Sequence, residues 1–318
     1  MHTPFGVCLN DDATELSVSH SFLNRITTWS HGIESLMEHP DFSDIHTIHR
    51  MKEHRPGCLL ATSSGNDCIF MMDKEEDEST KIVWTWNGIQ NGYSLSSTGR
   101  DLHHVKREDH NWCEVQPSMM CQSTHVNSAI EFDADHILAS FPLQQALVLI
   151  TLSSGDTRHL PIEVAFPHSI RHLAGEGLFM VTDSERNCVL FFNRSFQVVR
   201  RVALPMPADE CWNQCAAYHE ETRSIFTIHE KTLSEVVAKR DVSVTLEEIP
   251  FDVDVGVKRK SMCFGCRIME IHTVSDVQCA ELQRQWECSG ALLETAKKLI
   301  KDGSGGDMER RNDLVNPR

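Results

Sequence analysis

The chain has 318 residues, of which 40% are hydrophobic, and a net charge of −16. This apolar content is sufficient for a folded core and excludes a disordered chain. The acidity argues against a nucleic-acid backbone or an anionic membrane surface as partner, because both select a basic surface. The sequence shows neither a signal peptide nor an apolar run of the roughly 18 residues that a membrane span needs, so we expect a soluble, cytoplasmic protein.

The predicted strands begin near the amino terminus. Residues 5–36 contain short strands, with alternating side chains in Leu16-Ser17-Val18-Ser19. Residues 255–273, near the other end of the chain, also have β-like character. We expect these two end segments to combine into one blade, because such a closure removes the free edges from a ring of sheets.

A repeated strand–turn–strand unit occupies the middle of the chain. Residues 58–72 and 136–150 align without a gap, and residues 178–193 and, more weakly, 224–237 follow the same pattern. The positions that lead these units are separated by 79, 43 and 45 residues and are occupied by His46, His125, His168 and Asn213. The last two intervals match the ~40–45 residues of a propeller blade.

The repeats predict an all-β fold, a five-bladed β-propeller over residues 1–275, with six blades as the alternative. The longer first interval equals one blade plus an insertion at about residues 87–120, which is either a lid over one propeller face or a variable loop. Apolar residues at helical spacing predict a C-terminal helix over 276–302 that packs on the propeller. Residues 303–318 are predicted to be a disordered tail.

His46, His125 and His168 take the same repeat position in three predicted blades. The innermost strand of a blade lines the central channel, so we expect these side chains to converge on the axis. Imidazole is a common metal ligand and general base, and three histidines leave coordination positions open for water or substrate. Such a histidine can also be a hydrogen-bonded core residue, but the repetition favours a shared site. His49 and His172 are interpreted as strand or turn residues that support it.

The fourth repeat has Trp212-Asn213-Gln214 where the other three have histidine. Asn213 and Gln214 offer neutral polar groups, and we expect the three residues to line the channel beside the substrate. Trp212 can also be a core residue, as tryptophan more often is.

A motif around His125 carries a family resemblance. His125-Val126-Asn127-Ser128 is followed by the strand 137–140, and Pro167-His168-Ser169 comes one repeat later. This arrangement resembles the arylsulfotransferase-type propeller family, over about residues 44–195. The resemblance implies that His168 accepts the sulfuryl group and that His46, His125 and Asn127 bind its oxygens.

One position departs from that family. An arginine that neutralises the transferring group follows the serine strand in the family, whereas this chain has Phe141. Losing this charge removes a major electrostatic contribution to transfer. The turns at residues 64–67 and 183–187 resemble those of NHL-type propellers, a group that includes the peptidyl-amidating lyase, in which histidines hold zinc. This second resemblance implies a metal, which could supply the charge that Phe141 does not.

These patterns together predict a metal-dependent propeller enzyme of the lyase or oxygenase type. Its expected cofactor is a divalent metal (Fe, Zn or Cu) held by His46, His125 and His168, its expected catalytic residues are His168 and Asn127, and its expected substrate is a small molecule or a peptide. Sulfuryl transfer through His168 is one alternative. The other is a non-catalytic propeller that binds a protein partner on one face.

Overall fold

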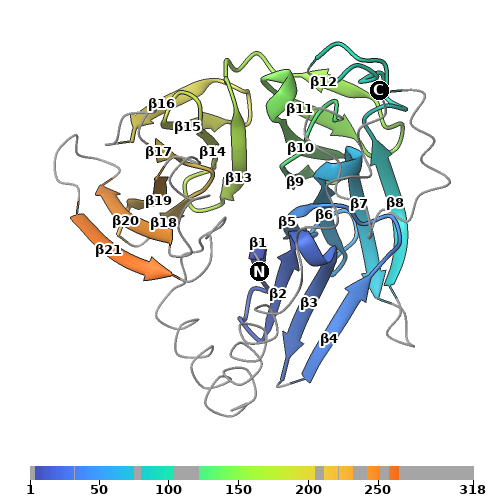
Figure 1. Ribbon diagram of the computed structural model, residues 1–318, viewed down its shortest axis with the longest axis horizontal. Coiled ribbons are helices and arrows are strands. Elements are labelled where there is room, and N and C mark those ends of the chain that lie inside the picture. The colour runs from blue at the N-terminus through green and yellow to red at the C-terminus, as the bar shows by residue number, and fades with distance from the viewer. Residues whose placement is uncertain are drawn as a thin grey trace.

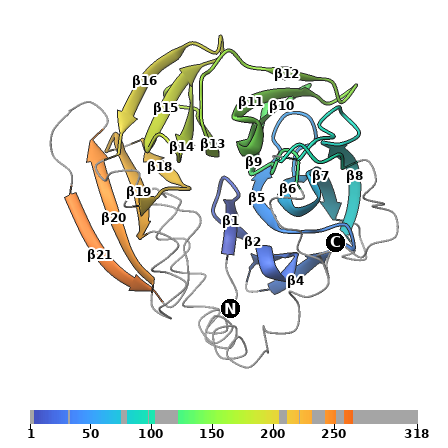
Figure 2. The same cartoon turned by 45° about the horizontal axis from the view of Figure 1, so that its top comes forward.

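The computed structural model is an all-β propeller (Figure 1). It describes residues 4–31, 33–74, 80–96, 98–102, 122–204, 211–220, 222–231, 242–250 and 258–264. These residues form five sheets around a common centre (Figure 2), which confirms the predicted fold class. The predicted helix 276–302 and tail 303–318 lie outside the described residues, and the total number of blades stays a prediction. In the described part of the chain, no helix has the length and apolarity to cross a membrane.

Each of the first four sheets is an antiparallel meander of consecutive strands. The first contains β1 (Pro4–Leu9), β2 (Glu15–His20), β3 (Arg25–Ser30) and β4 (Ile33–Glu38), and the second β5 (Ile45–Arg50), β6 (Leu59–Ser63), β7 (Cys68–Lys74) and β8 (Thr80–Asn87). The third contains β9 (Ser128–Asp133), β10 (His136–Phe141), β11 (Ala146–Thr151) and β12 (Thr157–His159), and the fourth β13 (Pro167–Leu173), β14 (Leu178–Asp183), β15 (Cys188–Asn193) and β16 (Val198–Ala203). The fifth contains β17 (Cys211–Trp212), β18 (Ala216–His219), β19 (Ser224–Lys231), β20 (Val242–Pro250) and β21 (Lys258–Phe264).

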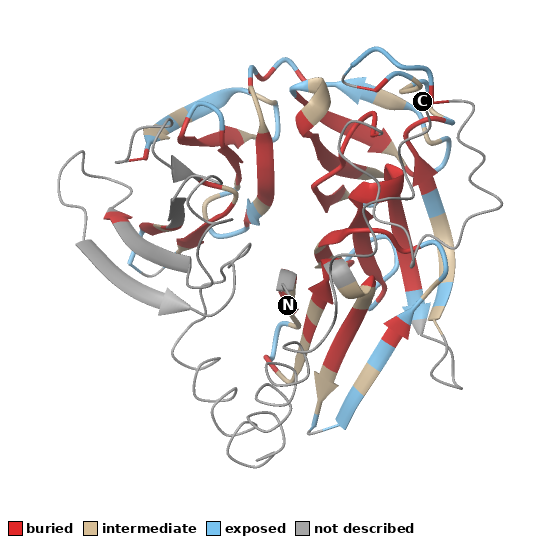
Figure 3. Ribbon diagram, viewed as in Figure 1, coloured by how far each residue is buried: buried red, intermediate tan, exposed pale blue. Residues whose placement is uncertain are grey.

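The strands β1, β5, β9 and β13 lie nearest the centre, each at one edge of its sheet (Figure 2). These inner strands contact one another around the ring, β1 with β5, β5 with β9 and β9 with β13. Buried residues concentrate on the inner and middle strands, whereas the outer strands β4 and β16 are largely exposed (Figure 3). The inner strands therefore carry the residues that can form a central site.

Within the described ranges, the first sheet is built from residues 4–38, and β21 pairs with β20 in the fifth sheet. The prediction that the two chain ends share a blade is therefore wrong for these strands. A tight turn explains the local pairing of β1 with β2: the side-chain oxygen of Asn10 accepts the Glu15 N–H at 2.8 Å, and Ala13 has a φ of 56°. Closing this short loop costs less entropy than pairing distant segments.

The tight turns between the second and third strands confirm the strand–turn–strand repeat. In each of the first four sheets this turn ends in a residue with a left-handed φ between 48° and 54°, namely Asn24, Asp67, Gln145 and Asn187. Three of the four are Asn or Asp, whose short polar side chains tolerate this conformation better than most. The turn chemistry is thus repeated together with the apolar pattern.

Buried hydroxyl groups on the second strands link neighbouring sheets. Ser19 Oγ donates to the carbonyl of His46 at 2.6 Å. Thr62 Oγ1 accepts the Thr47 N–H at 2.9 Å and donates to the carbonyl of Asn127 at 3.0 Å. These bridges fix His46 and Asn127 at the junctions between the first, second and third sheets.

Aromatic rings fill the interface between the second and third sheets. Phe141 is fully buried and stacks on Trp86 with ring centroids 5.1 Å apart, and Tyr93 packs edge-on against Phe141 at 5.2 Å. Phe141, at the position where the arylsulfotransferase-type family has arginine, is therefore a core residue. Tyr93 belongs to the predicted insertion at residues 87–120, so at Tyr93 this insertion packs between the second and third sheets. Residues 103–121, which contain most of the predicted lid, lie outside the described residues.

Candidate functional site

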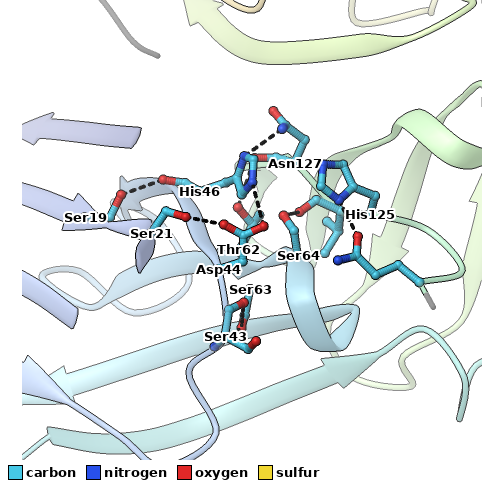
Figure 4. A network of polar contacts seen from close by, with 12 residues as sticks. Ser19, Ser21, Ser43, Asp44, His46, Thr62, Ser63, Ser64, His125 and Asn127 are labelled. Atoms are coloured by element: carbon cyan, nitrogen blue, oxygen red, sulfur yellow. Dashed lines mark hydrogen bonds and ion pairs between the residues drawn. The ribbon is translucent and has the colours of Figure 1, made fainter. Parts of the chain in front are cut away.

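A buried network joins the first three sheets near the beginning of the inner strands (Figure 4). Nε2 of His46 lies 3.3 Å from Asp44 Oδ2, and Nδ1 lies 2.8 Å from the amide nitrogen of Asn127. That amide nitrogen can only donate, so Nδ1 accepts and Nε2–H is directed at the carboxylate. Asp44 also accepts a hydrogen bond from Ser21, in the turn after β2. We call Ser21, Asp44, His46, Gln122, His125 and Asn127 the junction network.

His125 enters the junction network from the turn before β9, where its φ is 49°. Its ring lies edge-on to His46 with centroids 5.2 Å apart, and its Nδ1–H donates to Gln122 Oε1 at 2.5 Å. Burial, assisted by the neighbouring His46, lowers the pKa of His125 to about 4. For Asp44, burial opposes ionisation, but His46, His125 and Ser21 together outweigh this effect and hold the pKa of the carboxyl well below its usual range. The network thus combines a neutral His125 with an ionised Asp44.

The segment that carries His125 is held by Asp67, at the end of the turn between β6 and β7. The carboxylate is fully buried and accepts the backbone N–H groups of Ser123, Thr124 and His125, each at 2.8 Å. It also accepts the hydroxyls of Ser123 at 3.1 Å and Thr124 at 2.7 Å. Five donors on one carboxylate anchor the start of the third sheet to the second sheet.

His168 lies on β13, the inner strand of the fourth sheet, and is 1% exposed. Its Nδ1 lies 2.7 Å from Ser184 Oγ and 3.1 Å from the carbonyl of Phe166. Ser184 also donates to the carbonyl of Asn213, which links the fourth sheet to the fifth. His168 therefore belongs to a second buried cluster.

The residues predicted to line the channel in the fourth repeat have a different environment. Asn213 is fully buried, its amide nitrogen donates to Asn187 Oδ1 at 2.6 Å, and its Oδ1 accepts the Thr227 hydroxyl at 3.2 Å. Gln214 is half-buried, and the backbone of Trp212 pairs with Glu230 in the fifth sheet. None of the three lines the cavity described below, so their role at a substrate stays a prediction.

The strand register identifies Asn127, rather than His125, as the equivalent of His46 and His168. On the second strands of three sheets, a buried Thr or Ser marks one equivalent position: Thr62, Ser140 and Thr182. The residues two positions before these, Leu60, Leu138 and Met180, pair with inner-strand residues His49, Ile130 and Arg171 respectively. His49, Ile130 and Arg171 are therefore equivalent. Three positions earlier along the inner strands lie His46, Asn127 and His168. The alignment of His125 with the other two histidines is therefore wrong. The turn after β5 is longer than the turn after β9. The number of residues between the inner strand and the second strand therefore differs between these two sheets, and counting residues from the second strand gives the wrong equivalence.

Among the residues that the structure describes, no three His, Cys, Asp or Glu side chains lie close enough together to hold one metal ion. Both ring nitrogens of His46 are engaged by Asp44 and Asn127, and His168 is held in a different cluster. The histidines as arranged do not fit the predicted Fe, Zn or Cu site, and we derive no step through a metal.

A cavity of about 530 Å³ lies further along the same inner strands. Its walls come from β1, β5, β9, β13 and the adjoining turns, and contain residues 7–11, 47–50, 52–53, 128–132, 170–172, 174 and 194. His49 on β5 and Arg171 on β13 line it from the same register position in two sheets, and His172 follows Arg171. From the sequence, His49 and His172 were predicted to have a supporting role, and Arg171 was missed. Arg171 could have been found from its spacing, since His49 and Arg171 each come three residues after an inner-strand histidine.

Burial is the main reason that His49 stays neutral. Burial, opposed by Glu131 and assisted by Lys52 and Arg171, lowers the pKa of His49 to about 4. The pKa of His172 is also lowered, chiefly by burial. At neutral pH the cavity therefore presents an unprotonated imidazole beside a permanent guanidinium.

Glu131 on β9 fixes the turn that forms one wall of the cavity. Its buried carboxylate accepts the backbone N–H groups of Lys52, Glu53 and His54 at 2.7, 3.0 and 2.7 Å. These bonds tie the turn after β5 to the third sheet. Glu131 therefore positions the wall, and its charge is balanced by three donors.

No protein-family model and no curated protein sequence matches this chain. Among solved structures, a hydrazine synthase of Kuenenia stuttgartiensis aligns with a TM-score of 0.51 and 11% identity, covering 80% of this chain and 65% of that chain. A protein of unknown function from Bacteroides caccae gives 0.50 and 13%, covering 79% and 78%, and virginiamycin B lyase from Staphylococcus aureus gives 0.48 and 11%, covering 81% and 84%. At these identities the two alignments with TM-scores of 0.50 and 0.51 support a shared fold alone.

Proposed function

We propose that the protein is a propeller enzyme that takes a small-molecule or peptide substrate into the cavity and transfers a proton there in a lyase-type reaction, with His49 as the proton acceptor. One observation carries the proposal: an imidazole and a guanidinium, His49 and Arg171, line one cavity from the same register position of two inner strands. A neutral imidazole can accept a proton and a fixed cation can stabilise the negative charge that forms, so the pair suits proton abstraction next to an acyl group.

The cavity supports a division of roles. His49 is unprotonated at neutral pH, so it can accept a proton from a carbon next to a carbonyl group. Arg171 would stabilise the negative charge that develops on the substrate, because a guanidinium keeps its charge at every relevant pH. The carbanion would then expel a leaving group from the adjacent carbon as the C=C bond forms, and the leaving group would take the proton that His49 had accepted. His172 is exposed and follows Arg171 directly, which suits it to exchange protons with solvent.

Chemical modification at low pH tests this proposal. Diethyl pyrocarbonate reacts with neutral imidazole, and at pH 5.5 an ordinary histidine is only about one-tenth neutral, whereas a histidine with a pKa near 4 is almost wholly neutral. We therefore expect His49 to be modified about tenfold faster than ordinary exposed histidines, as measured by peptide mass spectrometry. His125 is the internal control, because its pKa is also lowered to about 4 but it is only 6% exposed. Absence of modification at His49, or equal modification at His125, would contradict the proposal.

The other predicted activities remain as competing proposals. A metal-dependent lyase or oxygenase would use His46, His125 and His168, and metal analysis of the purified protein tests it. Sulfuryl transfer would modify His168 in the presence of an aryl sulfate donor, with Asn127 binding the sulfate oxygens, which mass spectrometry would detect. Kinship with the arylsulfotransferase-type or NHL-type propellers, the five-blade count and a cytoplasmic location also stay predictions.

A non-catalytic propeller that binds a protein partner on one face is the remaining alternative. It requires no reactive group in the central cavity, so His49 would have no special role. Slow modification of His49 at pH 5.5 would favour this alternative over the enzyme.

A further inference from the structure

We infer that the cavity binds a ligand through an oxyanion, either a carboxylate or a phosphate, held by Arg171 beside His49. This inference rests on the proposed function and names its substrate class. The guanidinium of arginine offers paired N–H donors whose geometry matches both kinds of oxyanion.

The distribution of charge in the cavity favours an anion although the chain as a whole is strongly acidic. Four cationic residues line the cavity, namely Arg50, Lys52, Arg171 and Arg194, against three acidic ones, Asp11, Glu53 and Glu131. Arg50 pairs with Glu15, and Lys52 pairs with Asp11 at 2.5 Å, so these two cations already have acidic partners. The carboxylate of Glu131 is occupied by three backbone donors. Arg171 and Arg194 therefore favour an incoming anion, and Glu53 opposes it.

The positions of the cations place the anion near His49. Arg171 shares the register position of His49 across the cavity, and Arg194 lies over the ring of Phe132, 5.3 Å from its centroid, at the same wall. Charged and titratable groups face His49 from several elements: Lys52, Glu131, Arg171 and His172. An anion bound among them would offset the cations that disfavour a protonated His49. Binding of the anionic substrate would thereby increase the basicity of His49, the residue that accepts its proton.

Protection of His49 from diethyl pyrocarbonate tests the inference, with inorganic phosphate and succinate as separate probes. Each anion raises the protonated fraction of His49 and also occupies the cavity, so at a concentration ten times its Kd we expect modification at pH 5.5 to slow by about tenfold. Chloride at equal ionic strength is the control. Protection by phosphate alone or by succinate alone identifies which oxyanion the cavity selects.

Two variants separate a specific site from general screening. Arg171→Gln should abolish the protection and Arg171→Lys should keep part of it, with thermal unfolding confirming that both are folded. Arg194→Gln changes an exposed side chain, so it provides a second test that is independent of the fold; it should weaken protection.

The outcomes distinguish this inference from the proposed function. If His49 is modified rapidly but neither anion protects it, or if protection persists in both Gln variants, the oxyanion inference is overturned and the enzyme proposal stands. If His49 is not modified even without anions, the enzyme proposal itself fails.

Discussion

Replacement of Asp67 by asparagine is expected to destabilise the protein by about 3 to 4 kcal/mol. Asparagine keeps the size of the side chain and tolerates the left-handed backbone that Asp67 adopts, with φ of 54°, so backbone strain does not contribute. The carboxylate accepts five hydrogen bonds, and the amide NH2 of asparagine would turn a donor toward the N–H and hydroxyl of Ser123. The loss therefore combines missing hydrogen bonds with buried donors that have no acceptor. Urea unfolding measures the change.

Asp156→Asn is the matched control for that variant. Asp156 is exposed and accepts the Ser154 hydroxyl within a surface turn. Its replacement should change the free energy of unfolding by no more than about 0.5 kcal/mol. A loss below about 1 kcal/mol in Asp67→Asn would mean that Asp67 does not anchor the third sheet to the second.

The protein is expected to lose stability as the pH falls from about 6.5 to about 4. The pKa of His125 is lowered from 6.5 to about 4 in the folded protein, so the unfolded chain binds the proton more tightly. The stability from a neutral His125 is thus fully present above pH 6.5 and is lost as the pH approaches 4, by up to about 3 kcal/mol. His49 contributes in the same direction and window. Asp44, with its lowered pKa, contributes stability that is lost only below its usual pKa of 3.8.

Urea unfolding at a series of pH values measures this dependence. His125→Gln cannot bind the proton, so its stability should fall less steeply between pH 6.5 and 4 than that of the unchanged protein. An identical pH dependence in the two proteins would show that His125 is not buried in its neutral form.

The repeat could be predicted from the sequence because strand and turn chemistry agree. The apolar strands flank polar turns at equal spacing, and the turn ends at residues such as Asp67 and Asn187 that accept a left-handed backbone. The strand pairing of the first sheet could not be predicted, because alternating polar and apolar residues do not reveal which strands pair. The tight turn after Asn10 favours the pairing of β1 with β2.

The site was harder to predict, since register depends on turn lengths and bulges that the sequence conceals. His125 shares a residue type with His46 and His168, but Asn127 has their position in the register. The sequence predicted that His46, His125 and His168 converge. The structure brings His46 together with His125 and with Asn127, and it places His168 in a separate cluster. His46, His125 and Asn127 lie in a hydrogen-bonded junction between sheets, whereas the open cavity lies beside His49 and Arg171.

We propose that two histidines three residues apart on β5 have different roles: His46 stabilises the fold, and His49 takes part in the chemistry of the cavity. The free energies of unfolding of His46→Gln and His49→Gln at pH 7.5 test this division of roles most directly. His46→Gln leaves buried Asp44 and Asn127 without a common partner and should lose about 2 kcal/mol. His49→Gln should change stability by no more than about 0.5 kcal/mol, because residues that serve function are seldom optimised for stability. Equal losses in both variants would contradict the claim.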